Sequence, residues 1–193
     1  MDTLAKLITS FESASVVWKK GYPYVIHPLT DGVPRINSEI LEDVTEITAQ
    51  ILEKWDFDAI ITIEAMGLPT SATLAMKIKK PVIVVRKRPY NLDGEIRIDQ
   101  STGYSSGELY VNDISKGERV VIFDDMLSTG GTLRPLVSAL NGAGVTVVGA
   151  LMIAEKADAS IREQTHLDIP IRTIVRLDVG EDGLIKASRG NLE

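Results

Sequence analysis

The sequence contains no cysteine, and this absence excludes both disulfide bonds and thiolate metal sites. A chain without disulfides fits a reducing compartment, so we expect a cytoplasmic protein. No stretch approaches the roughly 20 apolar residues that a membrane helix needs. The N-terminal residues also lack the basic segment and the long apolar run of a signal peptide. We therefore expect no membrane partner.

Basic charge is scarce as well. The 193 residues include 21 Lys and Arg but 27 Asp and Glu, and the net charge is −6. Proteins that bind nucleic acid need a basic surface against the phosphate backbone, so we expect no nucleic-acid partner. Hydrophobic residues make up 44% of the chain, enough for one well-packed domain, and the length is too short for two large ones. We predict a single domain over 1–193.

Short apolar runs alternate along the chain with helical patterns. The runs typical of buried strands cover 59–65, 81–87, 119–125, 145–154 and 171–177. Apolar residues at helical spacing predict helices near 4–11, from a cap at Ser38 to Leu52, over 72–78 and over 133–140. Strands buried on both faces and separated by helices predict an α/β fold with a doubly wound, mostly parallel sheet.

The segment 89–112 interrupts this alternation. It is polar and rich in turn residues, with strand-like alternation only at 95–98 and 108–111. A long connection in a compact domain usually has a function or is disordered. Two interpretations stay open. The segment is either a solvated hairpin or a flexible lid loop that folds over a ligand, with glycines at 94, 103 and 107 allowing the movement.

The stretch VVIFDDMLSTGGTL, residues 120–133, indicates an anion site. We expect its strand to end at Asp124 and Asp125 and its helix to begin near Gly131. This places the turn at the carboxyl edge of the sheet, where open α/β folds bind ligands. Backbone N–H groups at a helix N-terminus attract a phosphate, and glycines let it approach the backbone. The predicted phosphate-binding residues are Ser128, Thr129, Gly130, Gly131 and Thr132.

The two adjacent acids, Asp124 and Asp125, precede this turn and need not face the phosphate. They can instead accept hydrogen bonds from two neighbouring sugar hydroxyls. The Gly-Lys-Ser/Thr ending of a nucleotide P-loop is missing, and no G-x-G-x-x-G fingerprint follows any predicted strand. The stretch therefore predicts a site that holds a ribose and its phosphate.

The segment DDMLSTGGT resembles the phosphoribosyl pyrophosphate (PRPP) motif of the type I phosphoribosyltransferases. The resemblance extends through nearly the whole chain, and the overall pattern is most like that of the archaeal hypoxanthine/guanine enzymes, near the adenine and xanthine enzymes. It implies a doubly wound parallel core, a small hood mainly within 15–37 plus the C-terminal segment, and a lid loop at 89–112. It also implies a homodimer.

The resemblance assigns further residues to the pyrophosphate. TIEAMGLP, residues 62–69, resembles the pyrophosphate loop of the family, which often contains a non-proline cis peptide, and it assigns Ala65, Met66 and Gly67 to this anion. The basic residues Arg86, Lys87 and Arg88 either contact the pyrophosphate or form a solvated edge. Glu64 either shapes the loop or acts behind the ligand contacts. Mg²⁺ is expected as cofactor, bound mainly through PRPP oxygens without direct protein ligands.

The resemblance also assigns the base to Lys156, where 6-oxopurine enzymes present a lysine, together with Ile26, His27 and Leu127. The alternative is that Lys156 is a surface residue at a strand end. An ammonium has only donors, so it suits the O6 acceptor of hypoxanthine or guanine and opposes the amine of adenine. Ile26-His27 stands where xanthine enzymes carry Asn-His, which disfavours a C2 oxygen. Tyr104 is assigned to the lid, although Gly103 stands before it where adenine enzymes have Glu. No side-chain general base is evident.

These features predict an enzyme of purine salvage. It would transfer the 5-phosphoribosyl group of PRPP to hypoxanthine, and possibly to guanine, releasing pyrophosphate and forming the nucleoside monophosphate. Adenine or xanthine phosphoribosyltransferase activity stays open as an alternative. A PRPP-sensing transcriptional regulator is a further alternative, although the acidic chain shows no helix-turn-helix pattern.

Overall fold

A computed structural model describes residues 3–101, 106–157 and 166–192. Its centre is a six-stranded sheet with the strand order β10-β9-β8-β7-β3-β4. The strands are β3 (Ala59–Ile63), β4 (Val82–Val85), β7 (Arg119–Leu127), β8 (Thr146–Lys156), β9 (Ile171–Val179) and β10 (Ile185–Arg189). Neighbouring strands from β4 through β9 run parallel, and β10 alone pairs antiparallel. The prediction of a mostly parallel α/β sheet is confirmed.

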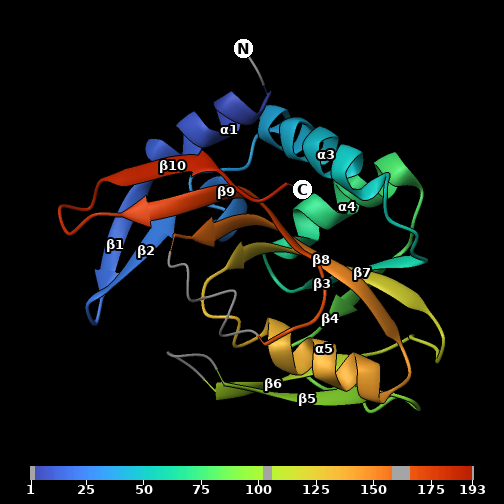
Figure 1. Cartoon of the computed structure of the whole chain (residues 1–193). Helices are drawn as coiled ribbons and strands as arrows, with labels where there is room; N and C mark the ends of the chain where they lie inside the picture. The colour runs from blue at the N-terminus through green and yellow to red at the C-terminus, as the bar shows by residue number, and fades with distance from the viewer. Residues whose placement is uncertain (1–2, 102–105, 158–165, 193) are drawn as a thin grey trace.

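Helices and a hairpin cover the two faces of this sheet (Figure 1). The helices α1 (Thr3–Glu12), α3 (Ser38–Leu52) and α4 (Gly67–Ile78) pack on one face. The helix α5 (Leu133–Gly142) and the hairpin of β5 (Ile96–Ser101) and β6 (Ser106–Val111) pack on the other. None of the helices in the described parts of the chain has the length and apolarity needed to span a bilayer.

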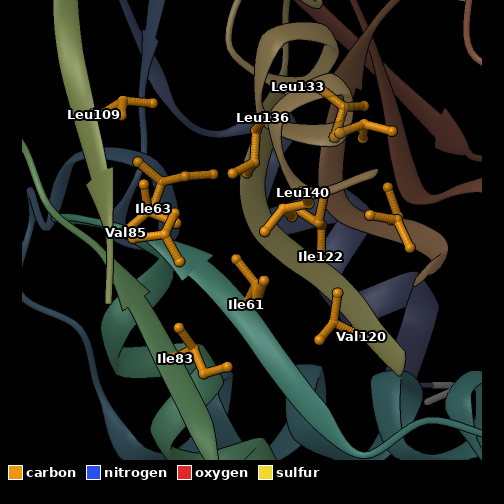
Figure 2. Packing of buried hydrophobic residues seen from close by; sticks show 14 of the residues in the cluster. Ile61, Ile63, Ile83, Val85, Leu109, Val120, Ile122, Leu133, Leu136 and Leu140 are labelled. Atoms are coloured by element: carbon orange, nitrogen blue, oxygen red, sulfur yellow. The ribbon is translucent and has the colours of Figure 1, made fainter. Parts of the chain in front are cut away.

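The central strand β7 shows why the sheet is buried on both faces. Successive side chains of a strand point to opposite faces. Val120 and Ile122 therefore join the core under α5, whereas Val121 and Phe123 join the core on the opposite side. Figure 2 shows the first of these cores, in which β3, β4, β7 and α5 contribute interlocking aliphatic side chains. A strand with two buried faces must be apolar throughout, as the run at 120–123 is.

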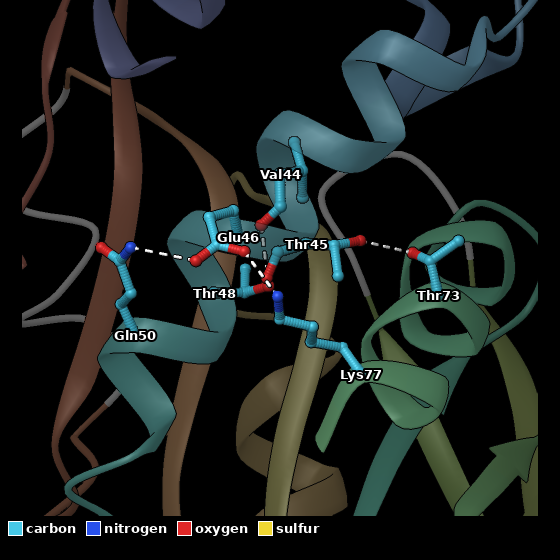
Figure 3. Close-up of polar contacts among 7 residues, drawn as sticks. All are labelled: Val44, Thr45, Glu46, Thr48, Gln50, Thr73 and Lys77. Atoms are coloured by element: carbon cyan, nitrogen blue, oxygen red, sulfur yellow. Dashed lines mark hydrogen bonds and ion pairs between the residues drawn. The ribbon is translucent and has the colours of Figure 1, made fainter. Parts of the chain in front are cut away.

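Polar contacts join α3 to α4, as Figure 3 shows. Glu46 forms an ion pair with Lys77 at 2.8 Å, and Thr45 Oγ1 donates to Thr73 Oγ1 at 2.7 Å. The first of these pairs is exposed and contributes little stability by itself. Together they fix the position of α4, whose first residue lies at the carboxyl edge of the sheet.

Two predicted boundaries were wrong. Asn37, and not Ser38, caps α3, because the Asn37 side chain accepts a hydrogen bond from Ile40 N at 2.9 Å. The strand at 119–125 continues to Leu127, because its pairing with β8 extends to the neighbours of Met126 and Leu127. Asp124 and Asp125 thus lie inside β7 and not at its end.

The segment at 89–112 contains the β5–β6 hairpin. Ile98 pairs with Leu109, and both are buried, as is Val111. One side of the hairpin is therefore part of the core beneath α5, and the description of a solvated hairpin is too simple. Residues 102–105, which include Tyr104, lie outside the described residues, so the lid stays a prediction.

A second hairpin precedes α3. It consists of β1 (Ser15–Lys19) and β2 (Tyr22–Ile26) and is followed by the short helix α2 (Pro28–Asp31). Lys20 and Gly21 form its two-residue turn with φ of 50° and 75°, values that suit the tight turns of twisted hairpins. This region falls within the segment expected to form the hood.

Candidate active site

A pocket lies where β2, α2, the last residues of β7 and β8, and the loop after β7 meet. It brings together side chains that are more than 100 residues apart in sequence, from Tyr22 to Lys156. The sequence-predicted residues that line it are Asp124, Asp125, Leu127, Ser128, Thr129, Gly130, Gly131, Thr132 and Lys156. The predicted phosphate site, the two acids and the predicted base-reading lysine therefore share one cavity.

The loop 128–132 ends at an uncapped helix. Within the described chain, no side chain caps the N-terminus of α5, and its first turn carries no acid. The Thr132 side chain donates instead to Gln100 Oε1 at 3.1 Å, which ties the loop to the β5–β6 hairpin. Gly130 has a φ of +70°, a left-handed conformation that favours glycine. Helix α5 therefore begins beside the pocket, at Thr132 and Leu133, with N–H groups that no described side chain caps, an arrangement that favours an anion.

The surroundings of the two acids disfavour their charged forms. Asp124 Oδ1 is buried and has no hydrogen-bond partner among the described residues. Burial, reinforced by the charge of Asp125, raises the pKa of Asp124 well above its usual range. Burial also raises the pKa of Asp125 to about 6. Such a pair is expected where a ligand supplies hydrogen-bond donors and positive charge.

The loop after β3 reaches Asp124 from the other side. It contains a cis peptide between Glu64 and Ala65, as the family resemblance implies, and α4 begins after Met66 at Gly67. A Cβ atom on Gly67 would lie against Thr62 Oγ1 and 2.5 Å from Asp124 Oδ1. There is no room for any side chain at Gly67, so the backbone of this loop packs directly on the acid.

Glu64 shapes the neighbouring basic segment. Its Oε1 accepts a hydrogen bond from Lys87 N at 2.5 Å, and its Oε2 forms an ion pair with Arg86 Nε at 3.2 Å. Arg88 donates to the hydroxyl of Tyr90 at 3.3 Å. The carboxylate of Glu64 thus joins the loop after β3 to the segment after β4.

Of the predicted pyrophosphate residues, Lys87 acts on the acids most directly. Its positive charge lowers the pKa of both Asp124 and Asp125, against the larger effect of burial. None of the predicted pyrophosphate residues, Lys87 included, is among the described residues that line the pocket. The set is Ala65, Met66, Gly67, Arg86, Lys87 and Arg88. They lie beside the pocket, behind Asp124 or along the basic segment.

Lys156 is the last residue of β8 and points into the pocket. Its Nζ donates to the carbonyl of Pro23 at 2.9 Å and lies 3.3 Å from the centre of the Tyr22 ring. Burial lowers the pKa of Lys156 to about 8. The ammonium is therefore partly desolvated, which strengthens its interaction with any acceptor that enters the cavity.

Ile26 and His27, which were also assigned to the base, are not among the described residues that line the pocket, so their role stays a prediction. His27 is buried and stacks on Phe11, with 3.8 Å between ring centroids. Its Nδ1 accepts from Leu29 N at 3.2 Å, and its Nε2 lies 3.1 Å from Ser10 Oγ. Both ring nitrogens are thus engaged in folding α2 against α1, and burial lowers the pKa of His27 to about 4.

The pocket residues that the sequence did not predict include Tyr22, Asp31 and Met152. Tyr22 could have been found, because Lys20-Gly21 between two apolar alternating runs is a hairpin signal. That signal puts Tyr22 at the start of the second strand. Asp31 and Met152 could not have been found, since their place depends on how α2 and β8 pack around the end of β7.

Comparisons with known proteins agree with this geometry. A family model described as phosphoribosyl transferase domain matches residues 35–177. The chain is 44% identical over 175 residues to the hypoxanthine/guanine phosphoribosyltransferase of Methanohalophilus mahii, covering 91% of each protein. It is 41% identical over 181 residues to the enzyme of the same name from Ferroglobus placidus, covering 94% of this chain and 96% of that one.

Solved structures show the same fold. The adenine phosphoribosyltransferase of Thermoanaerobacter pseudethanolicus superposes with a TM-score of 0.76 at 22% identity, covering 90% of this chain and 99% of that one. The Giardia lamblia enzyme complexed with 9-deazaadenine superposes with a TM-score of 0.76 at 17% identity, covering 90% and 97%. At such identities these two structures indicate the shared architecture and not a shared base.

Proposed function

The chain belongs to the phosphoribosyl transferase domain family, and we propose that it is a purine-salvage enzyme that transfers the 5-phosphoribosyl group of PRPP to hypoxanthine. Guanine is the second base that we propose. The products are the nucleoside monophosphate and pyrophosphate. One observation carries this proposal: a single cavity joins an uncapped helix N-terminus, two acids whose surroundings disfavour charge and the Lys156 ammonium. The helix N-terminus suits the phosphate, the acids suit the ribose hydroxyls, and the ammonium suits the purine.

The pocket residues hold PRPP at three points. The 5′-phosphate binds to the N–H groups and hydroxyls of 128–132, at the positive end of α5. The ribose hydroxyls donate to Asp124 and Asp125. The pyrophosphate lies over the backbone that begins at Gly67, next to Asp124. The positive charge of Lys87 acts on Asp124 and Asp125, so Lys87 is close enough to attract this anion as well.

The residues present fit PRPP-bound Mg²⁺. The buried, unpartnered Asp124 Oδ1 and the raised pKa of Asp125 mark a place that lacks positive charge. Among the described residues there is no cluster of three or more acids or histidines that could cage a metal alone. We therefore propose that Asp124 and Asp125 support Mg²⁺ through the ribose hydroxyls and water. When bound, Mg²⁺ neutralises charge on the departing pyrophosphate.

The reaction breaks the bond between ribose C1 and the pyrophosphate oxygen and forms a bond from C1 to a purine ring nitrogen, whose proton leaves to the pyrophosphate or to water. Positive charge develops on the ribose as the leaving group departs. The carboxylates of Asp124 and Asp125 orient the sugar and stabilise this charge. Lys156 and the phosphate loop fix the base and the ribose phosphate at opposite ends of the cavity, so that the reacting atoms meet in one geometry.

Base choice follows from the donors and acceptors in the pocket. The Lys156 ammonium can only donate, which suits O6 of hypoxanthine or guanine and disfavours the adenine amine. Asp31 lines the same cavity and offers an acceptor to the C2 amine of guanine. Xanthine stays open as an alternative base, because Ile26 is not among the described residues that line the pocket.

The test is turnover with four bases. The purified protein is mixed with PRPP and Mg²⁺ and with hypoxanthine, guanine, adenine or xanthine, and nucleotides are separated by chromatography. We expect inosine monophosphate as the main product and guanosine monophosphate as the second. A dominant adenine or xanthine nucleotide would overturn the base assignment. Tight PRPP binding without any product would point to a PRPP sensor instead of an enzyme.

We further propose a homodimer that acts in the cytoplasm. The dimer is supported by the family resemblance, and the compartment by the absence of cysteine, which suits a reducing environment. Light scattering after size exclusion should give twice the chain mass of 21.1 kDa. A monomeric mass at working concentrations would contradict the dimer.

A further inference from the structure

Tyr22, the first residue of β2, touches two separate parts of the pocket. Its hydroxyl lies 2.5 Å from Ser128 Oγ in the phosphate loop. The Lys156 ammonium lies 3.3 Å from the centre of its ring. One side chain of the β1–β2 hairpin thus contacts both the residue expected at the phosphate and the residue expected at the base.

The hydroxyl contact decides how Ser128 can serve a phosphate. A hydroxyl has one donor and two acceptor positions. A phosphate oxygen without a proton only accepts, so the single O–H donor of Ser128 must donate to the phosphate. The Tyr22 hydroxyl must then donate to Ser128 Oγ. The result is a directed chain from Tyr22 through Ser128 to the phosphate, in which each bond favours the next.

The ring contact decides how Lys156 can serve a base. The Pro23 carbonyl accepts one of the three ammonium protons, and the face of the Tyr22 ring attracts the charge. Cation–π attraction is stronger where the cation is desolvated, and the lowered pKa of Lys156 is consistent with such a place. Ring and carbonyl together leave the remaining protons free for an acceptor in the cavity.

We propose that Tyr22 is a positioning residue that couples the phosphate subsite to the base subsite. Its hydroxyl orients Ser128 and its ring orients Lys156, so that binding at one subsite holds Tyr22 in the arrangement that the other subsite needs. This inference rests on the proposed function, because it takes the ligands to be a ribose phosphate and a 6-oxopurine. Coupling of this kind is reciprocal: each ligand raises the affinity for the other by the same factor.

The variant Tyr22→Phe separates the two contacts, because it removes the hydroxyl and keeps the ring. Calorimetry measures the binding of ribose 5-phosphate and of hypoxanthine, each alone and in the presence of the other. We expect the variant to bind ribose 5-phosphate roughly 3- to 10-fold more weakly, the loss typical of one hydrogen bond. Its affinity for hypoxanthine alone stays within about twofold of wild type, and the wild-type coupling factor falls to near one.

Two further variants exclude a general loosening of the hairpin. Trp18→Phe is the control, since Trp18 pairs with Pro23 across the same hairpin, is 46% exposed and is not among the described residues that line the pocket. We expect it to keep its ribose 5-phosphate affinity. Ser128→Ala completes a double-mutant cycle, in which adding Tyr22→Phe to Ser128→Ala should produce no further loss.

The outcomes distinguish this inference from the proposed function. Unchanged coupling in Tyr22→Phe, additive losses in the cycle, or an equal loss in Trp18→Phe would each overturn the role of Tyr22 while leaving the transferase intact. Failure of the wild type to bind ribose 5-phosphate or to form a nucleotide would remove the proposed function, and this inference with it.

Discussion

The two halves of β7 contrast within one strand. Val120, Val121, Ile122 and Phe123 are apolar and have no exposed surface. The residues 124–127 begin with two acids whose pKa values are raised by burial. The pairing of β7 with β3 extends only to Ile122, whereas its pairing with β8 continues to Leu127. The first half stabilises the fold, and the second half places destabilising groups where one edge of the strand is open to a ligand.

The largest effect is expected in the first half. Ile122 is fully buried under α5, as Figure 2 shows, so Ile122→Ala should lower the free energy of unfolding by about 2–5 kcal/mol through lost burial and a cavity. Urea denaturation measures this change. Met76→Ala is the control, since Met76 is 73% exposed and should change stability by less than about 0.5 kcal/mol. The folded fraction of Ile122→Ala should keep the wild-type KM for PRPP, and a raised KM would show that core and site are not separable.

A smaller effect is expected at the base. Lys156→Met should reduce kcat/KM with hypoxanthine and guanine by roughly 1.5–3 kcal/mol, the value of a charge-assisted hydrogen bond. PRPP binding measured alone should barely change, because the phosphate loop and the acids belong to β7 and the turn after it. Adenine should gain relative to hypoxanthine, since a mismatched donor has gone. Wild-type kinetics with hypoxanthine would mean that Lys156 does not read the base.

The pH dependence of stability sharpens the contrast further. The pKa of Asp125 is raised to about 6 in the folded protein, so its contribution to stability is present at low pH and is lost as pH rises through 6. The variant Asp125→Asn does not lose this stability, because its amide side chain does not ionise. At pH 7.5 the variant should be more stable than wild type by about 1–3 kcal/mol, and near pH 4 the difference should vanish.

His27 acts in the opposite direction but cancels in this comparison. The pKa of His27 is lowered to about 4, so the stability that His27 contributes is present above pH 6.5 and is lost as pH falls through 4. This loss is the same in wild type and in Asp125→Asn. Denaturant curves from pH 4 to 7.5 give the difference between wild type and Asp125→Asn. A constant difference across this range would contradict the assigned cause, the buried charge of Asp125.

The smallest effect is expected at the predicted lid. If residues 90–108 close over the reaction, a protease should cut there in the free protein, and PRPP with a base analogue should slow the cutting a few-fold. The buried face of the hairpin, with Ile98 and Leu109, should confine the cuts to its outer part. Timed gel analysis with mass spectrometry locates them. Complete protection without ligand would show a rigid hairpin and end the lid hypothesis.

Local patterns predicted most of the sheet and much of the site. The five parallel strands are apolar runs, and a run buried on both faces is visible without knowledge of its neighbours. The phosphate loop was equally accessible, because glycines and hydroxyls between a strand and a helix carry their chemistry in the local chain. Lys156 was assigned from the family resemblance, and it lines the same pocket as the phosphate loop.

Features decided by distant contacts escaped prediction. Strand β7 extends past its acids because β8 continues beside it, and polar residues give no local sign of that pairing. His27 was assigned to the base because of its place in a family pattern, and its contacts within the fold were not foreseen. They join it to Phe11, Ser10 and Leu29, and the first two lie on another helix. The buried side of the β5–β6 hairpin likewise exists only because α5 packs on it.

Thermal unfolding at pH 7.5 tests most directly whether one carboxylate both destabilises the free protein and holds the ribose. Wild type and Asp124→Asn are each melted alone and with saturating PRPP and Mg²⁺. Without ligand, Asp124→Asn should unfold at a higher temperature, by roughly 2–4 °C for each kcal/mol of relieved burial. With ligand, wild type should gain far more than the variant, because PRPP binds it more tightly. An Asp124→Asn protein that melts lower than wild type without ligand, and gains as much from PRPP, would contradict both halves of this role.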